Sequence, residues 1–270
     1  MLIDARPCAR RFRHPHERTE KAVPHTLGLI GTGMIGSSVA RLAVSAGLEV
    51  VLSNSRGPET LADLVAELGG RARAATPAQA ARAADLVVAA IPLTAFAQLP
   101  AEALSGKTVL DTANYYPERD GHLAELDTGT LTSSALLQRH LPEALVVKAF
   151  NNITPHQLVS LARPAHAPDR SALPIAGDDA EAKTEATRFL DMLGYDAVDI
   201  GPLATSWRSE PNTPVYIEPY LGARPAMMLD EFFRWTLQTP GVPVPAARIA
   251  ELIEDADRQK PGEARLPSAD

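Results

Sequence analysis

The sequence predicts an α/β fold, in which a doubly wound parallel sheet carries a smaller C-terminal α+β part, and three features support this. A short apolar run at residues 27–30 leads directly into a glycine-rich turn. Short apolar segments then alternate with helix-forming segments as far as residue 152. Polar residues directly follow several of the apolar segments. Strands that alternate with helices form parallel sheets with right-handed crossovers, and these sheets bind ligands at the carboxyl ends of their strands.

The glycine-rich turn has the spacing Gly-x-Gly-x-x-Gly, at Gly31, Gly33 and Gly36. Between a strand and a helix, the first glycine permits the tight turn, the second leaves room for a pyrophosphate, and the third lets the helix pack closely on the strand. The start of the helix then offers free N–H groups and a positive dipole end to the phosphates. The turn therefore predicts a dinucleotide site in a Rossmann fold. The other turn residues assigned to this site are Thr32, Met34 and Ile35.

Six strands are expected in the parallel sheet, at residues 27–30, 48–52, 71–75, 85–91, 107–111 and 145–150. The helix after the glycines should end at Gly47, and the next one places apolar residues at helical spacing over residues 61–68. Thr76 is expected to cap the third helix, because Pro77 occupies its first turn. Further along, the pattern predicts a helix up to about residue 104, a loop over 112–130 and a helix over 134–140.

The chain is expected to divide into a flexible leader (residues 1–25), a dinucleotide-binding Rossmann domain (26–152), a smaller substrate-facing domain (153–236) and a C-terminal helix and tail (237–270). The smaller domain should contain strands at residues 173–176 and 195–200 with a helix between them. That helix is expected to bury Ala182, Ala186, Phe189, Leu190 and Leu193. We expect this domain to pack on the edge of the parallel sheet.

The composition excludes several classes of protein. The 270 residues are 45% hydrophobic and 22% charged, as in a globular protein, and no apolar run approaches the ~18 residues of a membrane span. A net charge of −7 argues against a broad nucleic-acid surface. Cys8 is the single cysteine, so no internal disulfide framework exists and a cytoplasmic location is expected. The basic leader lacks the apolar run of a secretory signal.

The end of the second expected strand indicates which dinucleotide is bound. An NAD site needs an acidic residue there for the ribose 2′-hydroxyl, whereas an NADP site needs a cation for the 2′-phosphate. The sequence has no acid at this point and instead reads Ser53, Asn54, Ser55 and Arg56. A guanidinium beside short polar side chains suits a phosphate, so we predict NADP(H). A solvated loop that merely contains an arginine would have the same sequence pattern.

Polar residues at the ends of the later strands should converge on one crevice, because the carboxyl ends of parallel strands share one edge of the sheet. The polar residues at these positions are Asp111, Thr112, Asn114, Lys148, Asn151 and Asn152, and the apolar pair Ile91 and Pro92 ends the fourth expected strand. Ile91 and Pro92 are expected near the nicotinamide half of the cofactor. Turn capping would equally explain Asp111 and Asn114, and a surface position would explain Lys148.

No catalytic apparatus of another class is visible in the sequence. It contains neither a Gly-x-Ser-x-Gly elbow nor a His-Glu-x-x-His zinc motif, and no metal site is expected. Hydride transfer needs no protein nucleophile, since the protein mainly positions two ring systems and excludes water. We therefore expect no catalytic side chain, with Lys148 and Asn151 as the candidates near the acceptor.

The sequence resembles the F420-dependent NADP oxidoreductases, also called NADPH-dependent F420 reductases. The matching stretches are Gly-Thr-Gly-Met-Ile-Gly at 31–36, Ser-Asn-Ser-Arg-Gly-Pro-Glu at 53–59, Val-Lys-Ala-Phe-Asn at 147–151, Ile-Ala-Gly-Asp-Asp at 175–179 and Val-Asp-Ile-Gly-Pro-Leu at 198–203. The resemblance implies hydride transfer between NADP(H) and the deazaflavin coenzyme F420, in a homodimer. It also implies that Arg56 holds the 2′-phosphate, that Ile91 and Pro92 pass the nicotinamide ribose, and that Asn151 lies beside the deazaflavin.

Two other classes stay open at this point. One is an NADPH-dependent reductase of a flavin, an imine or a small carbonyl compound. The other is a non-enzymatic NADPH sensor that signals through its dimer surface. The chain also departs from the family by its leader and by the segment after about residue 236. In each enzymatic case the partner is a small redox substrate, and neither nucleic acid nor membrane is involved.

Overall fold

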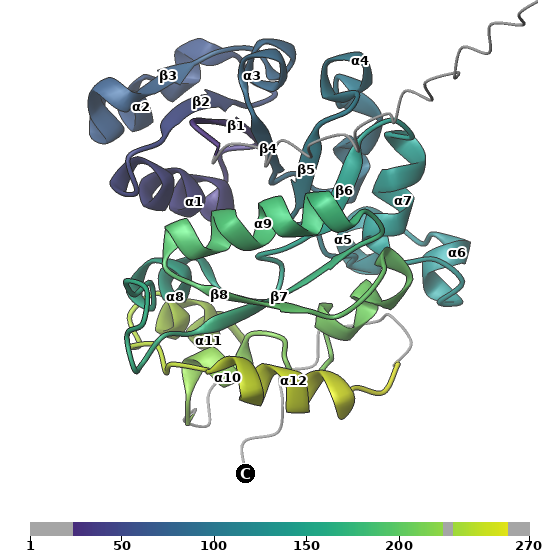
Figure 1. Cartoon of the computed structure of the whole chain (residues 1–270). Coiled ribbons are helices and arrows are strands. Elements are labelled where there is room, and N and C mark those ends of the chain that lie inside the picture. The colour runs from purple at the N-terminus through teal and green to yellow at the C-terminus, as the bar shows by residue number, and fades with distance from the viewer. Residues whose placement is uncertain (1–23, 224–228, 259–270) are drawn as a thin grey trace, which may run out of the picture.

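A computed structural model of the protein describes residues 24–223 and 229–258, and these residues contain one eight-stranded sheet (Figure 1). The strand order is β3-β2-β1-β4-β5-β6-β7-β8. The strands are β1 (Thr26–Ile30), β2 (Glu49–Ser53), β3 (Ala72–Ala74), β4 (Leu86–Ala89), β5 (Thr108–Asp111), β6 (Leu145–Lys148), β7 (Ala172–Gly177) and β8 (Asp196–Asp199). The first six are parallel, which confirms the predicted doubly wound α/β fold. The order reverses between β1 and β4, the point where such sheets bind ligands.

The last two strands extend the same sheet. β7 runs antiparallel to β6, with Val147 opposite Gly177 and Lys148 opposite Ala176, and β8 runs parallel to β7. The smaller part of the chain is therefore joined to the parallel sheet by backbone hydrogen bonds at its edge. The domain boundaries given above stay predictions.

Helices cover both faces of the sheet. The α-helices are α1 (Met34–Ser45), α2 (Ala62–Leu68), α3 (Pro77–Ala83), α4 (Ala101–Leu104), α5 (Pro117–Asp120), α6 (Ala124–Asp127), α7 (Ser133–His140), α8 (Pro155–Ser160), α9 (Ala180–Leu193), α10 (Glu218–Leu221), α11 (Leu229–Thr236) and α12 (Ala246–Glu254). Strand residues alternate between two cores because successive side chains point to opposite faces. Val88 and Leu110 join the core under α1 and α9, while Val87 and Val109 join the core under α3 and α7.

Several local predictions are confirmed. Thr76 caps α3 in a reciprocal capping box with Gln79, and Pro77 occupies the first helical position. All five residues expected inside α9 are buried. In Figure 1, α9 and α12 lie on opposite sides of β7 and β8, so these edge strands are covered on both faces.

Other segments differ from the prediction. Instead of one helix up to about residue 104, the chain forms a 3₁₀ helix (Leu93–Gln98) and then α4, because Pro100 interrupts the hydrogen-bond ladder. Residues 112–130, expected as a loop, contain the short helices α5 and α6. The leader up to residue 23 and the tail from residue 259 lie outside the described residues.

Gly36→Ala should destabilise the fold, because a Cβ built at Gly36 lies 2.0 Å from the carbonyl oxygen of Gly31. A backbone carbonyl group cannot move aside as a flexible side chain can. We therefore expect the free energy of unfolding to fall by about 1–3 kcal/mol or more. Urea denaturation measures this loss. Ser37→Ala on the same helix is the control and should stay within about 0.5 kcal/mol of the wild type. Equal stabilities for the two variants would contradict the close packing.

Candidate functional site

The three glycines of the turn after β1 have different surroundings. Gly31 has φ +98°, and an added Cβ would lie 2.2 Å from the carbonyl oxygen of Ala90. Gly36 is equally confined against Gly31, as described above. At Gly33, by contrast, no atom lies within 4 Å of an added Cβ. Two glycines are thus required by the protein itself, whereas the third leaves open space beside the backbone, as a bound pyrophosphate needs.

The start of α1 faces this open space. Gly33 is the N-cap of α1, and no side chain caps it. Met34 follows with 59% of its surface exposed, and Thr32 and Ile35 are partly exposed. The first amides of the helix therefore have no side-chain acceptor and suit an anionic ligand. Of the predicted turn residues, Gly31 to Ile35 are exposed or partly exposed, whereas Gly36 is buried.

The loop after β2 places its four predicted residues differently. Ser53 is fully buried, and its hydroxyl donates to the carbonyl oxygen of Leu29 at 2.9 Å. The expectation that this hydroxyl reaches a phosphate is therefore not met, because Ser53 still belongs to β2 and faces the sheet. Asn54 accepts from the N–H groups of Arg56 and Gly57 at 2.9 and 3.0 Å, so it shapes the loop.

Ser55 and Arg56 are exposed at the tip of that loop. Within the described residues, no hydrogen bond or ion pair engages the Arg56 guanidinium. An exposed guanidinium without a partner is available to bind a phosphate in a bidentate manner. The 2′-phosphate role thus stays a prediction that rests on Asn54, Ser55 and Arg56.

Ile91 and Pro92 come directly after β4 and lie against the glycine turn. The N–H of Ala90 donates to the carbonyl oxygen of Ile30 at 2.8 Å. The Ile91 side chain lies 2.9 Å from a Cβ built at Gly31. The ends of β1 and β4 are therefore in contact at the switch point, and Pro92 is exposed beside them.

Asn114 and Asn151 join the ends of β5 and β6. The amide of Asn114 donates to the carbonyl oxygen of Asn151 at 2.8 Å, and the amide of Asn151 donates to Oδ1 of Asn114 at 3.0 Å. The Asn151 amide also donates to the carbonyl oxygen of Ser209 at 2.6 Å, and its Oδ1 accepts from the Ser209 hydroxyl at 3.2 Å. Asn151 is only 5% exposed. Both N–H groups of the Asn151 amide are engaged in these bonds, so donation to a deazaflavin would require one of them to break.

Lys148 is neither at the surface nor at the crevice, because its side chain is only 1% exposed. Its ammonium donates to the carbonyl oxygen of Ala113 and to the Ser133 hydroxyl, both at 2.8 Å, and lies 3.3 Å from a carboxylate oxygen of Glu210. Asp111, fully buried, accepts from the Ser134 hydroxyl at 2.7 Å. Burial raises the pKa of the Asp111 carboxyl, although the Lys148 charge and the hydrogen bonds oppose this. Lys148 therefore links β5, β6 and α7 to the segment that contains Glu210.

Asn152 anchors the next part of the chain. It is fully buried, and its amide donates to the carbonyl oxygen of Val215 and to the Tyr220 hydroxyl, both at 3.1 Å. The Tyr220 hydroxyl in turn donates to the carbonyl oxygen of Ala172 in β7 at 2.9 Å. Asn152 thus fixes the chain around residue 217 beside the ends of the central strands.

A pair of tyrosines beside this site was missed at the sequence level. The hydroxyls of Tyr116 and Tyr216 are hydrogen-bonded to each other. Tyr116 follows β5 two residues after Asn114, which was a visible signal. Tyr216 comes from a segment a hundred residues later, and no local pattern could place it here.

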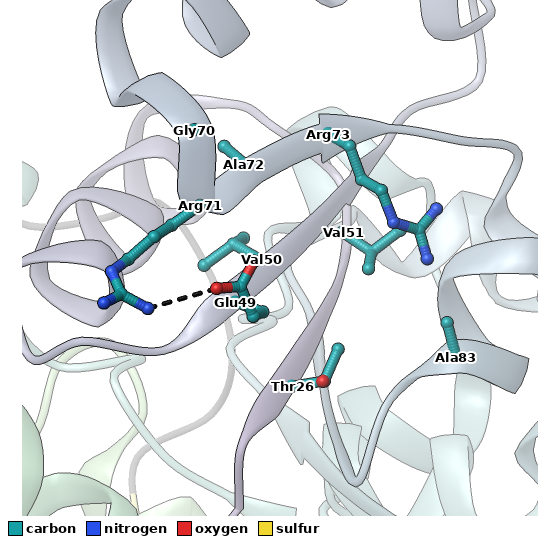
Figure 2. A pocket seen from close by; sticks show the side chains of 9 residues that line it. All are labelled: Thr26, Glu49, Val50, Val51, Gly70, Arg71, Ala72, Arg73 and Ala83. Atoms are coloured by element: carbon teal, nitrogen blue, oxygen red, sulfur yellow. Dashed lines mark hydrogen bonds and ion pairs between the residues drawn. The ribbon is translucent and has the colours of Figure 1, made fainter.

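A separate hollow lies at the opposite end of the sheet (Figure 2). It is formed at the amino ends of β1, β2 and β3, and its lining includes Thr26, Glu49 and Arg71. Arg71 donates to a carboxylate oxygen of Glu49 at 3.1 Å. Arg73, which is exposed, and Ala83 lie on its other side in Figure 2. Because ligands of such folds bind at the carboxyl ends, this hollow is not the predicted cofactor site.

Among the described residues, no three His, Cys, Asp or Glu side chains gather in a way that could hold a metal ion. In the same part of the chain, no helix has the length and apolar character needed to cross a membrane.

The sequence and the fold are both similar to those of known proteins. Residues 26–115 match the family model described as NADP oxidoreductase, coenzyme F420-dependent. The matched segment contains the glycine turn and the loop after β2. The resemblance found in the sequence is confirmed, and the chain is an NADP-dependent oxidoreductase, as predicted.

Two solved structures are similar to this enzyme. A protein of Arthrobacter sp. FB24, provisionally described as an F420-dependent NADP reductase, is 28% identical, covers 68% of this chain and 87% of its own, and gives a TM-score of 0.58. A hypothetical protein of Sinorhizobium meliloti is 27% identical, covers 72% of this chain and 93% of its own, and gives a TM-score of 0.63. No curated protein matches the sequence.

Gly33→Ala should leave the fold intact and weaken the cofactor. The new methyl group meets no protein atom, but it occupies the space in which a pyrophosphate approaches the backbone. Loss of the charge-assisted contacts there should lower NADPH affinity by about tenfold to a hundredfold. Fluorescence titration with NADPH measures the affinity, and circular dichroism reports the fold.

Gly70→Ala is the matched control, because an added Cβ there also meets no atom and Gly70 lies at the opposite edge of the sheet. It should bind NADPH like the wild type. If Gly33→Ala retained full affinity as well, this turn would not hold the pyrophosphate.

Arg56→Ala should weaken NADPH binding by about tenfold to a hundredfold, because a charge-assisted contact to a phosphate contributes about 1.5–3 kcal/mol. NADH lacks the 2′-phosphate, so its affinity should hardly change. Arg73→Ala, which removes an exposed guanidinium at the other edge, should alter neither affinity. Equal losses for NADPH and NADH in Arg56→Ala would contradict the assignment.

Lys148→Met should lower the free energy of unfolding by about 3–5 kcal/mol, because it leaves the Asp111 and Glu210 carboxylates without their buried cation. The Asp111 pKa already lies above its usual value and should rise further in the variant. The folded state then takes up a proton before the unfolded state does, so the deficit should shrink as the pH falls.

Urea denaturation at several pH values measures both effects. Lys183→Met is the control, because the ion pair of Lys183 with Asp199 is partly exposed and should contribute less than about 1 kcal/mol. A deficit in Lys148→Met that is small, or independent of pH, would show that this buried network carries little charge.

Proposed function

We propose that this enzyme transfers a hydride between NADP(H) and a flat ring acceptor, with the deazaflavin coenzyme F420 as the first candidate. The observation that carries the proposal is the match of the cofactor-binding residues to a family described as NADP-dependent and coenzyme F420-dependent. The open space at Gly33 and the unengaged Arg56 are consistent with NADP(H) on this side of the crevice. The second substrate would lie on the nicotinamide side, between the ends of β4 to β6 and the segment after β8.

The protein's own contribution in this proposal is positioning. The glycine turn and Arg56 would hold the two ends of the dinucleotide, and Ile91 with Pro92 would pack against its nicotinamide half. Asn151 would act by holding the β6 end against Ser209, since its amide is already engaged there. Displacement of reacting atoms by about 1 Å can cost on the order of a hundredfold in rate, so such positioning is a sufficient role.

One observation favours a second candidate, an NADPH-dependent imine or carbonyl reductase. Reduction of these compounds needs a proton donor, and the hydrogen-bonded hydroxyls of Tyr116 and Tyr216 provide one in the right region. Membership of an oxidoreductase family argues against a non-enzymatic NADPH sensor. A homodimer remains part of the proposal on the family resemblance, and light scattering of the full chain tests it.

The deciding experiment is an NADPH oxidation assay against coenzyme F420, FMN, FAD, quinones, and a set of imines and carbonyl compounds. We expect F420 to be reduced with the highest kcat/KM. The Gly33→Ala variant serves as a cofactor-deficient control for background oxidation. Robust imine or carbonyl reduction without transfer to any deazaflavin or flavin would overturn the proposal in favour of the second candidate.

A further inference from the structure

The hydroxyl pair of Tyr116 and Tyr216 joins the two walls of the predicted crevice. Tyr116 lies between β5 and α5, and Tyr216 lies between the 3₁₀ helix (Leu203–Ser209) and α10. Both residues are partly exposed, so the pair is neither sealed in the core nor free in solvent. Two phenols in one hydrogen bond use one proton between them, and the second proton remains available to a third atom.

The backbone around Tyr216 is held in an unusual conformation. Ile217 has φ +61°, which is rare for a β-branched residue. Its N–H donates to the carbonyl oxygen of Asn152 at 2.9 Å, and the N–H of Tyr216 donates to the carbonyl oxygen of Thr213 at 3.0 Å. Such strain persists only where the surrounding structure fixes it, and it is concentrated at functional sites. The folded chain therefore fixes the position of Tyr216 through these backbone contacts.

The surroundings of Tyr116 act in opposite directions on the pKa of its hydroxyl. The Arg119 guanidinium carbon lies 4.9 Å from the centre of the Tyr116 ring, and Asp120 balances the charge of Arg119. Burial raises the pKa of both phenols, so both hold their protons at neutral pH, while Tyr216, Arg119 and Asn114 favour the phenolate of Tyr116.

The pair lies next to the predicted nicotinamide end of the crevice. Asn114, two residues before Tyr116 in the chain, donates to the carbonyl oxygen of Asn151, just after the carboxyl end of β6. The glycine turn and Ile91 lie at the ends of the neighbouring strands β1 and β4. An acceptor ring bound at the carboxyl ends of β4 to β6 would lie at the same end of the sheet as Tyr116, which follows β5.

We propose that Tyr116 is the proton donor to the reduced acceptor, with Tyr216 and Arg119 as its positioning residues; this inference rests on the proposed function. When bound, NADPH supplies a hydride that forms a carbon–hydrogen bond on the acceptor ring, and NADPH becomes NADP⁺. The electron pair released in the ring collects on a ring nitrogen. The O–H bond of Tyr116 then breaks and an N–H bond forms at that nitrogen. The phenolate, stabilised by the Tyr216 hydroxyl and Arg119, regains its proton from water.

Tyr116→Phe tests the proposal through the rate with the acceptor found in the assay above. A general acid typically contributes a factor of about a hundred or more, so turnover should fall by at least that much while NADPH affinity stays within about twofold. Tyr216→Phe keeps the donor and removes its partner, so its loss should be smaller. Tyr195→Phe removes a buried hydroxyl that binds the carbonyl oxygen of Leu158, far from the crevice, and should leave turnover unchanged.

A second readout does not depend on turnover. In protein labelled at the tyrosine ring carbon Cζ, the NMR signal that is lost in Tyr116→Phe should shift when NADP⁺ and the oxidised acceptor bind together. The signal lost in Tyr195→Phe should not move.

Three results would overturn the proposal in distinct ways. A wild-type enzyme that reduces no flat acceptor would overturn the proposed function and this inference with it. An active wild type that is matched by Tyr116→Phe, or a Tyr116 signal that is unmoved by the ligands, would remove the inference alone. Loss of NADPH affinity in parallel with turnover would make Tyr116 a binding residue and not the donor.

Discussion

The close backbone contact at the start of α1 is the constraint on which the rest of the site depends. Gly36 packs against the carbonyl oxygen of Gly31, and Gly31 packs against Ala90 at the end of β4. Any side chain at either glycine would push the helix, the turn or the neighbouring strand apart. With both glycines in place, α1 begins directly above the switch point between β1 and β4, and the space at Gly33 stays open. The other elements of the crevice are arranged around this start.

The stretch from Lys148 to Asn152 is the joint between the two parts of the chain. Lys148 contacts Glu210, Asn151 contacts Ser209, and Asn152 contacts Val215 and Tyr220. These four contacts are polar and largely buried, and each pairs one residue of the joint with the segment after β8. Buried polar contacts of this kind are directional, so they fix where that segment lies as well as holding it. This explains how residues that do not reach the crevice can still shape its wall.

Much of the fold could be predicted because it follows local rules. The glycine spacing, the apolar strands and the Thr76 capping box each depend on residues close together in the sequence. The antiparallel pairing of β7 with β6 joins segments that are distant in the sequence, and no short sequence pattern predicts it. For the site, the position of each residue after a strand was predictable, whereas its side-chain direction was not. Ser53 turns into the sheet and Lys148 is enclosed by partners that come from β5, α7 and the Glu210 segment.

The tyrosine pair is a second feature that could not be predicted from the local sequence. Tyr116 stands two residues after Asn114 in the sequence, but its proposed chemical role depends on Tyr216 and Arg119. A hydroxyl becomes a candidate proton donor only through its neighbours, and these neighbours are set by the folded chain. The sequence therefore predicted a crevice without a donor, and the proposed donor emerges only from the tyrosine pair in the folded chain.

The central claim is that NADP(H) lies across the carboxyl ends of the central strands, and a crystal structure of the NADPH complex tests it most directly. We expect the pyrophosphate at Gly33, the 2′-phosphate at Arg56 and the nicotinamide between Ile91 and the Tyr116 hydroxyl. Density for the dinucleotide in the hollow beside Arg71 and Arg73, at the opposite end of the sheet, would contradict it.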